Sequence, residues 1–366
     1  MSRPARVRVS LSNLVHNCRQ ARAKAPDSSL MAVIKANAYG HGALACAQAL
    51  RGEADAFAVA ALDEALELRG GGIQDPIIVL HGVREPGELA SATEQNLCLV
   101  VHDSEQVALL EQATVSGMGP QLWLKVNTGM SRLGINPEQA ESCLAKLQAL
   151  PWHPGPVGLM THLACADEPG DAATHAQLEQ LAGISGAGDR SAANSAAVLR
   201  YPESHLDWTR PGLMLYGVAP AHSPPVDLRP VMTLEAPLLT IRDCRAGERL
   251  GYGAAYTCAS DMRVGLIEAG YADGYPHASN GQTEVAIGTE RFSTLGRVSM
   301  DLIAVDLTGS DADSGDWVEL WGSQVPVQDV AEKSGTIGYE LLTRVGHLRH
   351  EYSGLQGTSP DLPTPG

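Results

Sequence analysis

A lysine ends a run of small apolar residues in the stretch MAVIKANAYGHG, at residues 31–42. Lysine is almost never fully buried without a partner, so Lys35 requires either a counter-group or a ligand. Burial lowers the pKa of an amine, and a neutral lysine can form a Schiff base with an aldehyde. This chemistry suits pyridoxal phosphate, and Lys35 is therefore a candidate for the residue that binds this cofactor.

A phosphate group needs a site of its own, and two later stretches offer one. Residues 194–197 read NSAA and open a predicted helix, and residues 210–217 read RPGLMLYG. Backbone N–H groups at helix starts and in glycine-containing turns bind phosphate well. Such pairs are also common in ordinary loops, so they point to phosphate only in combination with Lys35.

The elements that would position these residues follow a regular alternation. Short apolar runs alternate with longer amphipathic segments, a pattern typical of βα units around a parallel sheet. The eight runs occupy residues 31–37, 57–62, 77–82, 97–102, 121–127, 158–164, 190–195 and 206–212. Eight strands with helices such as 136–150 between them favour an α/β fold with a closed (β/α)8 TIM-type barrel. A helix over 11–24, with Ser10 or Ser12 as its N-cap, precedes the first run.

Five of the predicted strands carry polar residues at their carboxyl ends, the face on which barrel enzymes place their active sites. Each such residue alone is most simply explained by a structural role, but their agreement across five strands indicates a site. They are Lys35, Lys125, His162, the pair Asn194 and Ser195, and Arg210.

The composition changes after the proline-rich stretch at 216–230. Beyond it, short strand-like runs alternate with turns rich in glycine and aspartate, as in small barrels and sandwiches. The chain therefore divides into a predicted barrel domain, 1–225, and a C-terminal mostly-β domain, 226–366.

Charge and cysteine content exclude several classes of function. The formal charge of −16 argues against nucleic acid or an anionic membrane as a partner, because both require basic patches. The seven cysteines are scattered and never occur as CxxC or beside histidines at ligand spacing, so we expect reduced thiols and no metal site. No run approaches the length needed to span a bilayer, which makes a cytoplasmic enzyme the default expectation.

Nine stretches, in order along nearly the whole chain, resemble the bacterial alanine racemases. They are AVIKANAYGHG, KVNTGMSRLG, THLACAD, ANSAA, RPGLMLYG, GYGAAY, AGYADGY, GRVSMD and YELL. The first, together with the GYADGY and GRVSMD pair, is highly specific. The resemblance implies a fold-type III pyridoxal-phosphate enzyme that interconverts L- and D-alanine and supplies D-alanine for peptidoglycan. It also implies a homodimer in which the β domain of one subunit completes the active site of the other.

The resemblance also implies a role for individual residues. Lys35 resembles the lysine that binds the cofactor and acts as a base on one face of the substrate, and Tyr252 of the partner resembles the base on the opposite face. Arg210 resembles the partner of the pyridine nitrogen. The phosphate and neighbouring cofactor contacts would come from Tyr39, His162, Asn194, Ser195, Gly212, Leu213 and Tyr339. The substrate contacts would come from Arg132, Met300, Asp301 and Tyr271. Lys125 resembles a lysine that the family carries as a carbamate.

One departure from the family pattern and three rival functions stay open. Asn127 stands where many relatives have aspartate, which removes a charge beside Lys125, so a bound anion could replace the carbamate. A racemase of serine or of a broader range of amino acids shares all these features. A pyridoxal-dependent decarboxylase would need a carboxylate at the position of Arg210, and a non-catalytic pyridoxal-binding protein would not need Tyr252.

Overall fold

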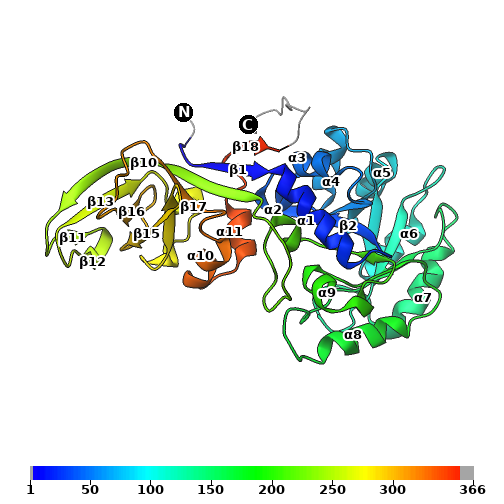
Figure 1. Ribbon diagram of the computed structural model, residues 1–366. Helices are drawn as coiled ribbons and strands as arrows, with labels where there is room; N and C mark the ends of the chain where they lie inside the picture. The colour runs from blue at the N-terminus through cyan, green and yellow to red at the C-terminus, as the bar shows by residue number, and fades with distance from the viewer. Residues whose placement is uncertain (1–2, 355–366) are drawn as a thin grey trace. The chain divides into compact units, whose positions relative to one another are not determined.

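The computed structural model describes residues 3–354, which form two compact units (Figure 1). The first unit is His16–Arg229, and the second combines residues 3–15 with residues 230–354. The part of the predicted β domain that follows residue 354 lies outside the described residues.

The first unit is a closed barrel of eight parallel strands, as the sequence predicts. The strands are β2 (Ser29–Val33), β3 (Ala56–Val59), β4 (Ile77–Val79), β5 (Cys98–Val101), β6 (Gln121–Lys125), β7 (Gly158–Met160), β8 (Arg190–Ser191) and β9 (Trp208–Thr209). Pairing of Ser29 with Trp208 closes the ring between the first and last strands. Each strand overlaps its predicted apolar run and is shorter than that run.

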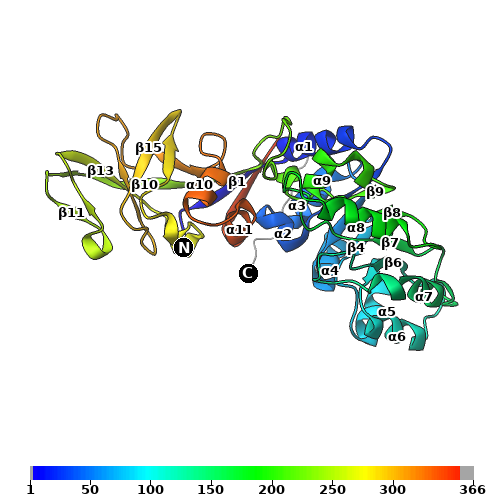
Figure 2. The same ribbon diagram turned by 90° about the horizontal axis from the view of Figure 1, so that it is seen from below.

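Helices alternate with the barrel strands along the chain, and Figure 2 shows α5, α6 and α7 at the edge of this unit. The helical segments of this unit are α1 (Leu11–Lys24), α2 (Lys35–Gly40), α3 (Ala43–Leu50), α4 (Leu62–Gly70), α5 (Pro86–Glu94), α6 (Ser104–Gln112), α7 (Pro137–Gln148), α8 (Ala173–Ala182), α9 (Ser195–Arg200), η1 (Pro202–Ser204) and η2 (Leu213–Tyr216). The predicted bounds of the first helix, 11–24, are confirmed, and Ser10 Oγ accepts the Asn13 N–H at its start.

The sequence pattern explains why these segments adopt their structures. β3 and β4 are buried at every residue, because helices cover a parallel sheet on its outer face and side chains fill its interior. In α7 the buried residues Ala140, Cys143, Leu144 and Leu147 recur every three or four positions and form one apolar stripe.

The second unit is built on one large, mostly antiparallel sheet, in which only the pairing of β1 with β18 is parallel among the described strands. Its strands are β1 (Arg6–Ser10), β10 (Met232–Cys244), β13 (Met262–Ile267), β14 (Glu284–Ile287), β15 (Glu290–Leu295), β16 (Ile303–Asp306), β17 (Trp317–Trp321) and β18 (Arg349–Ser353). The long β10 pairs with β17 through its first half and with β13 through its second half, so six strands close into a ring. The unit also contains the two-stranded β11 (Arg249–Leu250) and β12 (Tyr256–Thr257), the 3-10 turns η3 (Tyr252–Ala254), η4 (Tyr271–Asp273) and η5 (His277–Ser279), and helices α10 (Val327–Lys333) and α11 (Gly338–Arg344).

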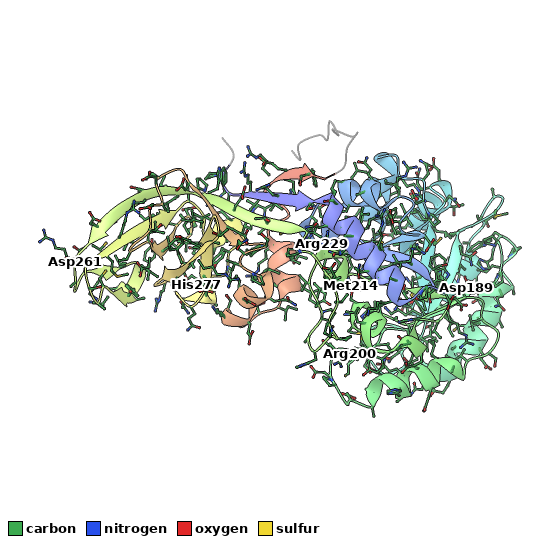
Figure 3. The ribbon with its side chains drawn as sticks, viewed as in Figure 1. Asp189, Arg200, Met214, Arg229, Asp261 and His277 are labelled. Atoms are coloured by element: carbon green, nitrogen blue, oxygen red, sulfur yellow. The ribbon has the colours of Figure 1, made fainter. Side chains whose placement is uncertain are left out.

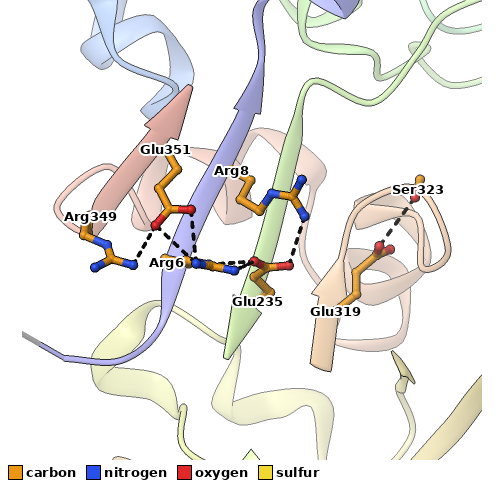
Figure 4. A network of polar contacts seen from close by, with 7 residues as sticks. All are labelled: Arg6, Arg8, Glu235, Glu319, Ser323, Arg349 and Glu351. Atoms are coloured by element: carbon orange, nitrogen blue, oxygen red, sulfur yellow. Dashed lines mark hydrogen bonds and ion pairs between the residues drawn. The ribbon is translucent and has the colours of Figure 1, made fainter. Parts of the chain in front are cut away.

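The N-terminal strand β1 inserts between β10 and β18, a pairing that the sequence analysis did not anticipate. Val7 and Val9 are fully buried on one face, whereas Arg6 on the other face contacts Glu235 at 2.6 Å and lies 3.6 Å from the ring of Trp317. Figure 4 shows Arg6 and Arg8 reaching Glu235, and Glu351 on the other side of Arg6. These ion pairs fix the register of three strands that are distant in the sequence.

None of the described helices is long and apolar enough to cross a membrane. All seven cysteines carry free thiols, as the sequence predicts, and five of them are buried.

Candidate active site

Lys35 begins an unusual turn at the carboxyl end of β2. The four residues after it, Ala36 to Tyr39, all have left-handed backbone angles, with φ between 52° and 53°. This conformation costs L-residues roughly 1–2 kcal/mol each, so neighbouring groups must hold it. Asn37 Oδ1 accepts the Ala43 N–H at 2.7 Å, and a carboxylate oxygen of Glu64 accepts the Ala36 N–H at 2.5 Å.

The barrel mouth gathers five cationic or basic side chains: Lys35, Lys125, Arg132, His162 and Arg210. Burial lowers the pKa of Lys35, and the positive charge of Arg132 lowers it further, whereas the carboxylate of Glu64 raises it. Burial and the nearby arginines lower the pKa of Lys125 to about 8. Burial, and then Arg210 and Lys125, holds the pKa of His162 well below its usual range. An imbalance of charge of this kind favours anions, because an anion relieves the mutual repulsion.

Arg210 follows β9 and is buried. Its two terminal nitrogens donate to Ser191 Oγ and to the backbone oxygens of Thr161 and Ala192. Burial lowers its pKa to about 10, so the guanidinium keeps its proton at neutral pH. Within the described chain no hydrogen bond uses its Nε–H, which leaves one donor available for a ligand.

The residues predicted to hold phosphate converge at the start of α9 and η2. Asn194 caps α9 by accepting the Ala197 N–H. Ser195 Oγ accepts the backbone N–H groups of Gly212 at 2.9 Å and of Met214 at 3.3 Å. Met214, labelled in Figure 3, is itself fully buried. The hydroxyl of Ser195 therefore marks a point where two backbone donors converge, as at phosphate sites.

Tyr39 and Gly212 meet at the same place. A Cβ atom on Gly212 would lie 2.6 Å from the Tyr39 hydroxyl oxygen, so only glycine lets this tyrosine approach. The Tyr39 ring stacks on Tyr216 at 4.7 Å between centroids, and the Tyr216 hydroxyl donates to the Val33 carbonyl. Leu213, the first residue of η2, is buried beneath the turn.

Arg132 lies in the loop after β6, and Asn127 shapes that loop. Asn127 Oδ1 accepts the N–H groups of Gly129 at 3.2 Å and Ser131 at 2.9 Å, and Ser131 has a left-handed φ of 55°. Arg132 itself is exposed and makes no hydrogen bond or ion pair within the described residues. An amide at position 127 can thus organise the loop without adding a charge.

In the β-rich unit, the structure brings together Tyr271, Met300 and Asp301. The Tyr271 N–H donates to the Ser299 carbonyl, and the Ala272 N–H donates to the Met300 carbonyl at 3.0 Å. The side chains of Tyr271 and Met300 are 44% and 52% exposed. The ring of Tyr271 contacts that of His277, which is labelled in Figure 3, edge to face.

Arg3 joins the two loops of this cluster. Its guanidinium bonds both carboxylate oxygens of the buried Asp273 and also contacts Asp301 at 2.6 Å. Asp273 in turn accepts the Gly270 N–H. Sequence analysis did not identify Arg3, because nothing in the sequence links residue 3 to residues 273 and 301.

The two remaining predicted residues lie elsewhere in the β-rich unit. Tyr252 begins η3 between β11 and β12, and its side chain is 72% exposed. Tyr339 lies in the first turn of α11 and is 41% exposed. Large exposed tyrosines of this kind are common where a surface binds a partner or ligand.

Two barrel residues that sequence analysis missed are Glu64 and Gln177. Glu64 lies in the first turn of α4 and accepts the Ala60 and Ala61 N–H groups in addition to that of Ala36. Gln177, buried in α8, donates to the His162 carbonyl and accepts the Ala164 N–H. The sequence offers a signal for Glu64, because it is an acidic residue in the first turn of a helix that follows a barrel strand. It offers no such signal for Gln177.

Comparison with known proteins gives a consistent result. Residues 9–220 match the family model for the alanine racemase N-terminal domain, and residues 231–352 match that for the C-terminal domain. The alanine racemase of Azoarcus sp. strain BH72 is 47% identical over 96% of this chain and 100% of its own. The biosynthetic alanine racemase of Pseudomonas aeruginosa superimposes with a TM-score of 0.91, at 41% identity over 96% of this chain and 100% of its own. The alanine racemase of Acinetobacter baumannii has a TM-score of 0.89 and 36% identity, over the same shares of the two chains.

Proposed function

The chain belongs to the alanine racemase family, and from this premise we propose that it interconverts L-alanine and D-alanine with pyridoxal phosphate bound at the barrel mouth. The observation that carries the proposal is the group of basic side chains around Lys35, which among residues 3–354 only one carboxylate, that of Glu64, offsets. Both the cofactor and an amino acid present anionic groups that such a site attracts.

The residues at the barrel mouth fit the cofactor. Ser195, with Gly212 and Leu213 at the start of η2, would hold its phosphate, together with Tyr39 and Tyr339. The free Nε–H of Arg210 suits the pyridine nitrogen, beside His162 and Asn194. Lys35, whose pKa is lowered, would bind the aldehyde carbon. When bound, the cofactor withdraws electrons from the amino acid joined to it and so weakens the Cα–H bond.

Racemisation removes a proton from one face of Cα and returns one to the other, so two acid/base groups are required. Lys35 would serve one face through its Nζ atom. Tyr252 of a partner subunit would serve the opposite face through its hydroxyl, and the high exposure of this side chain in its own unit supports donation to a second copy.

Arg132 would bind the substrate carboxylate together with the backbone of Met300, with Asp301 and Tyr271 lining the approach. Arg132 has no protein acceptor among the described residues, which suits a ligand-binding role. Lys125, with a pKa of about 8, is partly neutral in mild alkali, and a neutral amine adds carbon dioxide to give a carbamate and a proton. That carbamate, or a bound anion in its place, would orient Arg132.

The proposal also covers the location, the oligomeric state and the metabolic role of the enzyme. We propose a cytoplasmic homodimer with shared active sites, which supplies D-alanine for peptidoglycan and has no nucleic-acid or membrane partner. An arginine facing the ring nitrogen, where a pyridoxal-dependent decarboxylase needs a carboxylate, makes that rival function less suitable.

The first test is a pair of measurements on the purified protein. The visible absorbance band of bound pyridoxal phosphate is recorded, and deuterium incorporation at Cα is then followed for L-alanine and L-serine in heavy water, with formation of the D-isomers. We expect a band that Lys35→Ala abolishes and that Lys24→Ala, a change in the last turn of α1, retains. D-alanine should form much faster than D-serine.

Each other result has a definite meaning. Faster formation of D-serine, or similar rates for several amino acids, would replace alanine with that broader substrate range. A band without any D-isomer would leave a cofactor-binding protein that is not a racemase. The absence of a band would refute the pyridoxal proposal.

A further inference from the structure

The turn that presents Lys35 depends on a side chain from another element. Its first left-handed residue, Ala36, donates its N–H to Glu64 Oε1 at 2.5 Å, the shortest of three backbone bonds to this carboxylate. The other two come from Ala60 at 2.7 Å and Ala61 at 3.2 Å, in the loop between β3 and α4. One carboxylate therefore ties the turn after β2 to the loop after β3.

The same carboxylate is placed to affect the charge state of Lys35. The positive groups that face this lysine are Arg132, from the loop after β6, and Lys125, at the end of β6. His162, after β7, and His81, after β4, are close enough for the charge of Lys35 to lower their pKa. Glu64 is the one carboxylate among the described residues that stabilises the ammonium form of Lys35. Without it, both burial and charge would favour the neutral amine.

We propose that Glu64 is a positioning residue for Lys35, holding the strained turn through Ala36 and balancing the positive charge around the lysine amine. This inference deepens the proposed function, on which it rests for the role of Lys35. The two contributions are separable. Glutamine can keep its one acceptor oxygen on the Ala36 N–H, while it loses the charge and the second oxygen, which accepts from Ala60 and Ala61. Aspartate keeps the charge and loses the reach.

The test measures Lys35 directly in the full-length chain, freed of cofactor with hydroxylamine. Reductive methylation with formaldehyde and dimethylamine-borane is followed from about pH 6 to pH 10 by mass spectrometry of the Lys35 peptide, since only the neutral amine reacts. We expect Glu64→Gln to lower the midpoint of the labelling profile by about one pH unit, the lower end of the effect of a nearby opposite charge. Asp63→Asn is the matched control, because it removes the same charge from the exposed neighbouring position, whose carboxylate accepts a hydrogen bond from the Glu64 N–H.

The second measurement is hydrogen exchange at the Ala36 amide. In Glu64→Asp the shorter side chain no longer reaches this N–H, so exchange should accelerate at least tenfold while the labelling midpoint of Lys35 stays nearer to that of the unmodified chain. If Glu64→Gln does not fold, the exchange result for Glu64→Asp decides the matter. Profiles that overlay for Glu64→Gln, Asp63→Asn and the unmodified chain, or unchanged Ala36 exchange in Glu64→Asp, would overturn the proposal.

The rate at which the cofactor-free chain captures pyridoxal phosphate links the two observations to the site. We expect Glu64→Asp to slow capture by at least fivefold because the turn that aims Lys35 is loosened, and Asp63→Asn to leave the rate unchanged. Failure of every variant and of the unmodified chain to capture the cofactor would refute the proposed function. The labelling and exchange results would still decide the role of Glu64 toward Lys35.

Discussion

Substitution of Gly212 by alanine tests the tight contact that forms the predicted phosphate site. The new Cβ atom would lie 2.6 Å from the Tyr39 hydroxyl oxygen, so the two atoms must separate by about 0.8 Å to reach an ordinary contact. The φ of Gly212 is −126°, so no left-handed backbone strain adds to the steric contact with Tyr39. Tyr39 is 8% exposed and stacked on Tyr216, and it has little room to move sideways.

Overpacking of this kind costs roughly 1–3 kcal/mol. The cofactor-free chain can relieve the clash by moving the hydroxyl toward the place of the phosphate, but the cofactor-bound chain cannot. The cost should therefore appear as a rise in the dissociation constant of pyridoxal phosphate of about 5- to 150-fold. Absorbance titration of the cofactor-free protein measures it.

Two controls make this prediction specific. Gly87→Ala, in α5 with open space at the new Cβ, should leave affinity unchanged and slightly raise stability, because alanine favours a helix. In a Tyr39→Phe background the clashing oxygen is absent, so Gly212→Ala should cost much less there than in the unmodified chain. Equal costs in the two backgrounds, or no loss of affinity from Gly212→Ala alone, would refute the steric reasoning.

Three further predictions concern charged groups. Folding lowers the pKa of Lys125 from 10.5 to about 8, so below pH 8 the folded state carries a buried charge that water solvates freely in the unfolded state. Lys125→Met should therefore raise the free energy of unfolding of the cofactor-free chain, measured in urea at pH 7, by up to about 3 kcal/mol. This gain should disappear as the pH rises through 10. Glu235→Gln should lower the free energy of unfolding by about 1–3 kcal/mol, because Arg6 and Arg8 lose the buried carboxylate that they contact. The exposed Glu284→Gln should change this free energy by less than about 0.5 kcal/mol. Equal effects of the two substitutions in urea unfolding would contradict a role for burial. Arg3→Ala should raise the KM for alanine about 5- to 30-fold with a smaller change in kcat, since the loops of Tyr271 and Met300 lose about 1–2 kcal/mol of stabilisation. In the same racemisation assay, Arg8→Ala should alter neither KM nor kcat.

The barrel could be predicted because the sequence patterns that specify its strands and helices are local. Each strand is a short apolar run and each helix an amphipathic segment, so periodicity alone places them in order. The N-terminal strand β1 shows the limit of this reasoning. Its alternation of arginine and valine is a strand signal, but its partners β10 and β18 lie more than 200 residues away, and no local pattern records that pairing.

The same distinction between local and distant information applies to the residues of the site. The sequence by itself determined the types and order of the groups at the strand ends, such as Lys35, Lys125 and Arg210, because parallel strands bring their carboxyl ends to one face. Only the tertiary structure decided that Glu64 holds the turn beside Lys35 and that Arg3 joins the loops of Tyr271 and Met300. These contacts depend on where side chains from separate elements end in space, and spacing along a chain carries no measure of that distance.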